Sequence, residues 1–141
     1  TVDAKEQEAK GFVDGIFKAC FENLVGLAPS LSNVKLYDYQ VKPKLKTNRS
    51  SSGADAKVSV NIIMEVKEHG LAEFSNASRS VLHSSFAAIL EAFQFYVNCE
   101  KTFHKIQLVL EDAKQRNRGD IIQSCVSDLS KLTEVNTYEK K

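Results

Sequence analysis

The 141-residue chain contains no tryptophan, one methionine, two prolines and only three cysteines. Nineteen basic side chains oppose eighteen acidic ones, so no excess charge favours nucleic acid or an anionic membrane as a partner. No apolar run approaches the ~20 residues that a membrane-spanning helix needs. With 43% hydrophobic and 26% charged residues, the composition is typical of one globular domain, or of a domain with an appendage.

The cysteines Cys20, Cys99 and Cys125 are odd in number and far apart in the chain. Cys20 and Cys125 fall on the apolar stripes of expected helices, where a thiol behaves as a small hydrophobic side chain. This use of cysteine favours a reducing, cytoplasmic setting. The chain begins with Thr1 instead of methionine, so we expect a fragment or a processed protein.

Two helices are predicted from apolar residues at the spacing of one helical face. The first runs from about Phe12 to Leu24, and Gly26 and Pro29 end it. The second covers about residues 80–98. Its expected apolar face consists of Leu82, Phe86, Ile89, Leu90, Phe93 and Val97.

The clearest predicted strand runs from Val58 to Val66, where apolar and polar side chains alternate, so one face should be buried. A preceding strand covers Val34 to Val41 and stops before Pro43. A polar loop from Lys44 to Gly53 joins these two strands. A turn at residues 68–70 leads to a short return strand over residues 71–75.

A weak internal repeat relates the two helices, because Phe17 aligns with Phe86 and Ala19 with Ala88. A strand–strand–strand–helix unit used twice would explain it. The first copy would be incomplete, with one strand over residues 2–9 and its helix. The predicted fold class is therefore α+β, with a mostly antiparallel sheet packed by two helices and a helical hairpin at the C-terminus.

Residues 99–141 are expected to form a helical tail, distinct from a domain of residues 1–98. Residues 117–119 interrupt the helical spacing, and Asp120 to Gln123 resembles a capping box that begins another helix. We expect the chain to be frayed from Thr133 to Lys141. The expected contact residues of this hairpin are Phe103, Ile106, Leu110, Ile122, Cys125 and Leu129.

The sequence contains no pattern typical of an enzyme active site. His69, His83 and His104 form no pair at metal-ligand spacing. A Gly-rich phosphate loop, a serine nucleophile elbow and a Cys-x-x-Cys pair are all missing. We therefore expect no catalytic residue, no metal and no cofactor.

A site for a free amino acid is better supported. Such a ligand needs donors for its carboxylate, an acceptor for its ammonium group and an apolar slot for its side chain. The N-terminus of the first predicted helix, after Gly11, can hold the carboxylate, and Asp14 can accept from the ammonium. Leu36 and Tyr39 can form the walls. Taken alone, the pattern favours a structural alternative, with Gly11 in a turn, Asp14 at the helix dipole and the other two in the core.

Three ordered parts of the chain resemble one known family. The first is Ala9-Lys10-Gly11-Phe12-Val13-Asp14-Gly15, similar to a Gly-x-Gly-Pro-Val-Asp-Ala helix start. The second is Leu36-Tyr37-Asp38-Tyr39 with the later Gly53-Ala54-Asp55-Ala56, similar to a Leu-x-Asp-Tyr strand and a Gly-x-Asp segment. The third is Ser80-Val81-Leu82-His83-Ser84-Ser85, similar to Asp-Ile-Ile-x-Ala-Ser. Together they resemble the C-terminal regulatory domain of the 2-isopropylmalate and citramalate synthases, over about residues 4–97.

The resemblance implies a non-catalytic domain that binds leucine or isoleucine as a feedback inhibitor of leucine or isoleucine biosynthesis. It also implies a homodimer and a separate acetyl-CoA-condensing catalytic domain, which this chain does not contain. An incomplete repeat with an open sheet edge favours a dimer independently. The site residues implied by position are Gly11, Val13, Asp14, Leu36, Tyr39 and Ala56.

Two alternatives to an amino-acid-binding regulatory domain remain open. The first is a ligand-free protein–protein interaction or assembly module on the same fold. The second is an RNA-binding loop formed by Lys42, Lys44, Lys46 and Arg49. Interleaved exposed aromatic residues and an overall basic excess are both missing, which disfavours RNA binding. We therefore expect neither nucleic acid nor a membrane as a partner.

Overall fold

The computed structural model describes residues 2–43 and 57–138. Its elements are, in order, α1 (Val2–Leu24), the short 3-10 helix η1 (Pro29–Asn33), β1 (Val34–Pro43), β2 (Val58–Val66), β3 (Gly70–Ser78), α2 (Val81–Gln115) and α3 (Gly119–Val135). The predicted α+β class is confirmed, with an antiparallel sheet, two helices packed on it and a C-terminal helix pair. The predicted loop from Lys44 to Gly53 lies outside the described residues.

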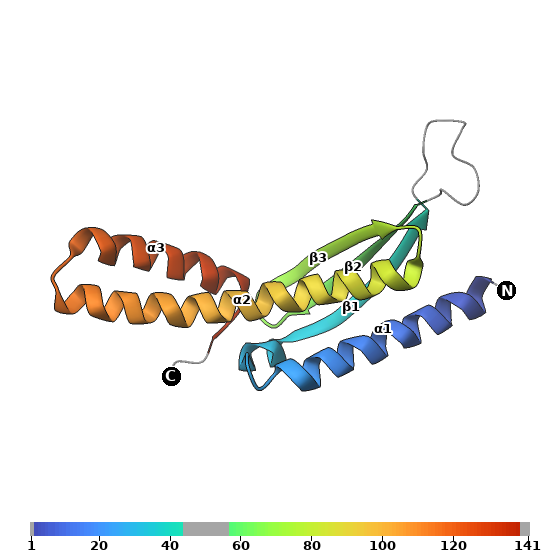
Figure 1. Ribbon diagram of the computed structural model, residues 1–141, viewed down its shortest axis with the longest axis horizontal. Helices are drawn as coiled ribbons and strands as arrows, with labels where there is room; N and C mark the ends of the chain where they lie inside the picture. Colours follow the sequence, from blue (N-terminus) through green and yellow to red (C-terminus); the bar gives the residue numbers. More distant parts are fainter. Residues whose placement is uncertain (1, 44–56, 139–141) are drawn as a thin grey trace, which may run out of the picture.

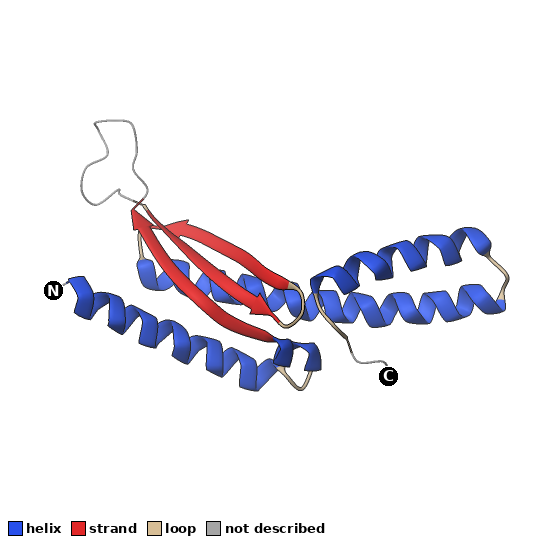
Figure 2. Ribbon diagram, turned by 180° about the vertical axis from the view of Figure 1, so that it is seen from behind, coloured by secondary structure: helices blue, strands red, loops and turns tan. Residues whose placement is uncertain are grey.

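The sheet has the strand order β1-β2-β3, with both strand pairs antiparallel. Figure 1 shows α2 crossing one face of this sheet and α1 running beside it. Figure 2, seen from behind, shows the strands in front of α2. Within the described residues, no element covers this second face of the sheet.

The strand β2 supplies the centre of the core. Its residues Val60, Ile62, Met64 and Val66 are buried, and the residues between them are more exposed. Burial of a side chain of this size contributes about 1.5–3 kcal/mol. The predicted alternation along this strand is therefore confirmed, with Val60 and Ile62 facing the interior.

The helix α1 begins at Val2, so the strand predicted over residues 2–9 is wrong. The segment is rich in alanine, glutamate, lysine and glutamine, which are good helix formers and poor strand formers. Gly11 does not interrupt the helix, although a glycine in a helix interior costs about 1 kcal/mol. The repeat therefore lacks its first strand, and the structure does not confirm it.

The helix α2 is one continuous element of 35 residues. It begins after Ser80, whose hydroxyl oxygen accepts a hydrogen bond from the His83 backbone N–H at 3.2 Å. The predicted end at Asn98 is wrong, because neither glycine nor proline interrupts the helix there. The proposed boundary between residues 98 and 99 falls inside this helix.

The face of α2 that packs on the sheet differs in part from the prediction. Leu82 and Phe86 are 52% and 44% exposed, whereas Phe93 is 2% exposed. Small residues occupy the buried positions near the start of the helix, which allows the helix to approach the strands closely. These small buried residues are Ser84, Ser85, Ala88 and Ala92.

The second half of α2 and α3 form the predicted helical hairpin, which extends away from the sheet in Figure 1. The predicted capping box at Asp120 is wrong, because α3 begins at Gly119 and its N-cap Arg118 makes no side-chain capping bond. The predicted fraying from Thr133 is also wrong as far as Tyr138: the helix continues to Val135, and Asn136 and Tyr138 are buried. Of the helices described, none combines the length and apolar character required to cross a bilayer.

The hairpin side chains expected to make contacts are covered to different degrees. Phe103 and Cys125 are buried. The other four are partly covered: Ile106, Leu110, Ile122 and Leu129. A hairpin of two helices can cover only one side of each helix, which explains the intermediate burial.

Candidate functional site

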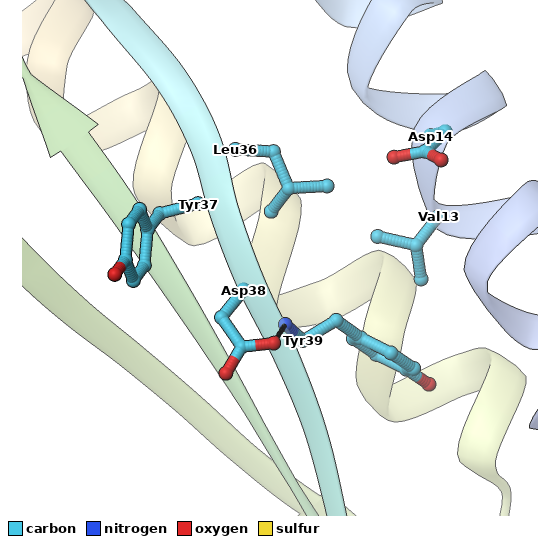
Figure 3. Close-up of a pocket in the computed structure, with 6 residues that line it drawn as sticks. All are labelled: Val13, Asp14, Leu36, Tyr37, Asp38 and Tyr39. Atoms are coloured by element: carbon cyan, nitrogen blue, oxygen red, sulfur yellow. Dashed lines mark hydrogen bonds between the residues drawn. The ribbon is translucent and has the colours of Figure 1, made fainter.

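A pocket of about 200 Å³ lies between α1 and β1. Figure 3 shows Val13 and Asp14 on α1 facing Leu36 on β1 across this pocket. Its volume is below the roughly 300–1,000 Å³ of pockets that hold drug-sized ligands. The pocket therefore suits a ligand smaller than a drug-sized molecule. Its lining residues are Val13, Asp14, Leu36, Tyr37, Asp38 and Tyr39.

A β-bulge in β1 shapes one wall of the pocket. Leu36 pairs with Met64 on β2, whereas Asp38 pairs with the adjacent Ile63, so Tyr37 is an extra residue without a partner. In a regular strand, residues 36 and 39 would point to opposite faces. The extra residue turns both toward the helices, while Tyr37 is 60% exposed.

Tyr39 is held in place by α2. Its hydroxyl lies 2.7 Å from the Ser85 hydroxyl, which also donates to the Val81 carbonyl oxygen at 2.6 Å. Tyr39 is buried, so its hydrogen-bonding group is used within the protein and its ring contributes apolar surface to the pocket. The tyrosine therefore serves as a rigid wall for an apolar group.

Two carboxylates line the pocket, and their environments differ. Asp38 accepts hydrogen bonds from the backbone N–H of Tyr39 at 2.8 Å and from the Gln40 side-chain amide at 3.2 Å. Asp14 is exposed on α1 and has no hydrogen-bond or ion-pair partner among the described side chains. Asp14 is therefore the carboxylate that can accept a hydrogen bond from a bound cationic group.

The structure brings four of the six predicted site residues to one pocket: Val13, Asp14, Leu36 and Tyr39. Gly11 is exposed on α1, two residues before Val13, and does not line the pocket. Ala56 lies outside the described residues. Tyr37 and Asp38 were not predicted as site residues, because simple alternation gives no sign of the bulge between Leu36 and Asp38.

The predicted carboxylate-binding helix start is wrong at this position. The helix begins nine residues before Gly11, at Val2, so residues 11–14 lie in the helix interior. Their backbone N–H groups form the intrahelical hydrogen bonds and are not available to a ligand. None of the six lining residues carries a positive charge. A ligand carboxylate would therefore need donors from elsewhere.

No group of three or more histidine, cysteine, aspartate and glutamate side chains within residues 2–43 and 57–138 is arranged to hold a metal ion. Comparison with known proteins finds no match to any protein-family model, any curated protein or any solved structure.

Proposed function

We propose that this chain is a non-catalytic regulatory domain that binds a small branched-chain amino acid, of the kind found in the 2-isopropylmalate and citramalate synthases. The observation that supports the proposal is the pocket in which Val13, Asp14, Leu36 and Tyr39 meet. These residues lie on two different elements, α1 and β1, and the family resemblance implies all four of them as parts of one site.

The side chains of the pocket match the parts of such a ligand. The Asp14 carboxylate accepts hydrogen bonds from the ammonium group. Val13, Leu36 and the ring of Tyr39 provide apolar contact for the aliphatic tail. A methyl group changes affinity by only ~1–3 kcal/mol, so leucine and isoleucine are both suitable.

The ligand carboxylate points away from Asp14 and Asp38, because two negative charges at the pocket repel it. Solvent or a second copy of the chain donates hydrogen bonds to this carboxylate. The ligand can regulate the catalytic domains only if it binds one arrangement of the assembly more tightly than the other. Ligand binding is then coupled to the arrangement of the catalytic domains.

Asp14→Ala is expected to weaken binding of leucine or isoleucine by about 1.5–3 kcal/mol, since the ammonium group loses a charged hydrogen bond. This corresponds to a dissociation constant roughly tenfold to a hundredfold higher. Thermal shift across a concentration series measures the change. Glu22→Ala, at another exposed acidic residue of α1, is the matched control and should leave affinity unchanged. Equal affinity in both variants would remove Asp14 from the site.

We also propose a homodimer in solution. β1 and β3 are both edge strands, and no described strand pairs with their outer sides. Unpaired edges and an uncovered sheet face are surfaces that a second copy can cover. Sedimentation equilibrium at micromolar concentration should give about twice the mass of one chain. A mass near 15.7 kDa would contradict this proposal.

The alternative of a ligand-free assembly module uses the same uncovered surfaces. It predicts a dimer without any response to amino acids. The thermal-shift series therefore separates the two functions, because only the regulatory domain gains stability from the ligand.

A further inference from the structure

Residues 136–138 follow α3 and form a short segment that we call the C-terminal strap. Figure 1 shows the chain after α3 crossing α2 toward η1. Asn136 is fully buried, and its amide nitrogen donates to the Ser30 carbonyl oxygen at 3.1 Å. Its amide oxygen accepts from the Asn33 side chain at 3.2 Å. The strap therefore attaches the hairpin to η1.

The strap has two further attachments. The Tyr138 ring stacks on Phe103 of α2, with ring centroids 4.6 Å apart. His69, in the turn between β2 and β3, has one ring nitrogen 2.8 Å from the Thr137 hydroxyl and the other 3.1 Å from the Glu134 carbonyl oxygen. Three separate parts of the domain thus contact three consecutive strap residues.

The polar atoms beneath the strap are poorly paired. Glu100 is 2% exposed, and one carboxylate oxygen accepts from the Ser30 backbone N–H at 3.2 Å, while the other has no hydrogen-bond partner. The hydroxyls of Ser30 and Tyr96 are also buried without a partner, and the buried Tyr138 hydroxyl has only the Cys99 thiol beside it. Within the described residues, all buried unpaired side-chain oxygens lie in this one cluster.

The free energy of strap docking has a favourable and an unfavourable contribution. Asn136, Thr137 and the Tyr138 ring gain specific contacts when the strap is in place. Docking also keeps a carboxylate and three hydroxyls away from water without full compensation, which is unfavourable. The two contributions offset each other in part, so release of the strap requires less free energy than global unfolding.

We propose that the C-terminal strap is a two-state closure, which opens while the sheet and its two helices stay folded, and which uncovers Glu100 and Cys99 on α2. Because Ser30 and Asn33 belong to η1, which leads directly into β1, a docked strap also fixes the start of the strand that lines the pocket. Opening frees η1 from the hairpin. The inference does not depend on ligand binding.

Cys99 is a natural reporter of the open state. It is partly covered, and burial raises the pKa of its thiol, an effect that the neighbouring Tyr138 hydroxyl partly offsets. Both conditions slow alkylation, since the thiolate is the reactive form. When the strap opens, Tyr138 moves away from Cys99, so the thiol becomes exposed and is alkylated faster.

The test is alkylation of the full chain with iodoacetamide under native conditions, followed by mass spectrometry that resolves each cysteine. Asn136→Ala should increase the Cys99 rate about tenfold or more, since it removes the two side-chain bonds to η1. Cys20 and Cys125, which lie on α1 and α3, should keep their rates and provide internal controls. An unchanged Cys99 rate, or an equal increase at all three cysteines, would overturn the proposal.

Two milder variants keep the test decisive if Asn136→Ala does not fold. Thr137→Val removes the hydroxyl that meets His69 and should raise the Cys99 rate severalfold. Glu100→Gln replaces the unpaired carboxylate oxygen with an amide donor for the neighbouring hydroxyls, so it should lower the Cys99 rate. A simple packing role predicts faster labelling in both variants, and that result would also overturn the two-state closure.

Discussion

A chain that ends at Asn98 is expected to lose about 3–5 kcal/mol of its free energy of unfolding, because the hairpin returns to cover the domain. The truncation removes Val135, which packs against the main core, and Asn136, which bonds to the Ser30 carbonyl oxygen. It also removes Glu100, the partner of the Ser30 backbone N–H. Small domains have only about 5–15 kcal/mol of stability, so this loss is large.

Urea unfolding of both chains measures the difference. A second truncation at Gln115 keeps Glu100 and Phe103 but removes α3 and the strap. Its stability should fall between those of the full chain and the shorter truncation. If the chain ending at Asn98 unfolds at the same urea concentration as the full chain, the hairpin is a passive extension and its contacts with η1 contribute nothing.

Phe93→Ala is expected to destabilise the fold by about 3–5 kcal/mol. Phe93 is buried at the point where α1, α2 and the sheet meet, and its ring lies 5.1 Å from the ring of Phe17 on α1. Loss of the ring leaves a cavity and removes an aromatic pair that joins the two helices. Since α1 forms one wall of the pocket, the variant should also weaken ligand binding.

Phe86→Ala is the matched control for this substitution, on the same helix and with the same change in volume. Phe86 is 44% exposed, so the expected loss is below about 1 kcal/mol. Thermal or urea unfolding of the two variants provides the comparison. Similar losses for both would show that the assignment of the α2 faces is wrong.

The sequence predicted the sheet well because its signals are local. Apolar and polar residues alternate from Val58 to Val66, and this two-residue period is typical of a half-buried strand. Its neighbour β3 follows β2 in the chain after a short turn, so this pairing is local. The turn before β3 is also local: Glu68 and Gly70 have positive φ angles of 70° and 88°. β3 is longer than predicted because its polar residues do not alternate as clearly.

The extents of the helices were less predictable. Helical spacing identifies a buried face, but among the first nine residues of α1 only Val2 is a large apolar residue, so periodicity could not show that they continue the helix. Near the start of α2 the buried face includes serine and alanine beside Ile89 and Phe93, and the small side chains give a weak hydrophobic signal. Both errors arise from reading apolar residues alone, whereas intrinsic propensity sets the helix ends here.

The candidate site was predicted in part for a physical reason. Leu36 and Tyr39 lie on the same side of β1 only because Tyr37 bulges, and a bulge depends on the register with β2. Resemblance to a family could indicate these positions without explaining them. The predicted role for Gly11 failed because it required a helix start, and α1 begins at Val2.

Isothermal titration calorimetry of the full chain with leucine, isoleucine and valine tests the central claim most directly. The account predicts saturable heat with at least one of the three, at a dissociation constant of about 1 mM or lower. It also predicts that this heat diminishes in Asp14→Ala and persists in Glu22→Ala. No saturable heat with any of the three amino acids at millimolar concentration, in a folded and dimeric sample, would contradict the account and leave the ligand-free assembly module as the function.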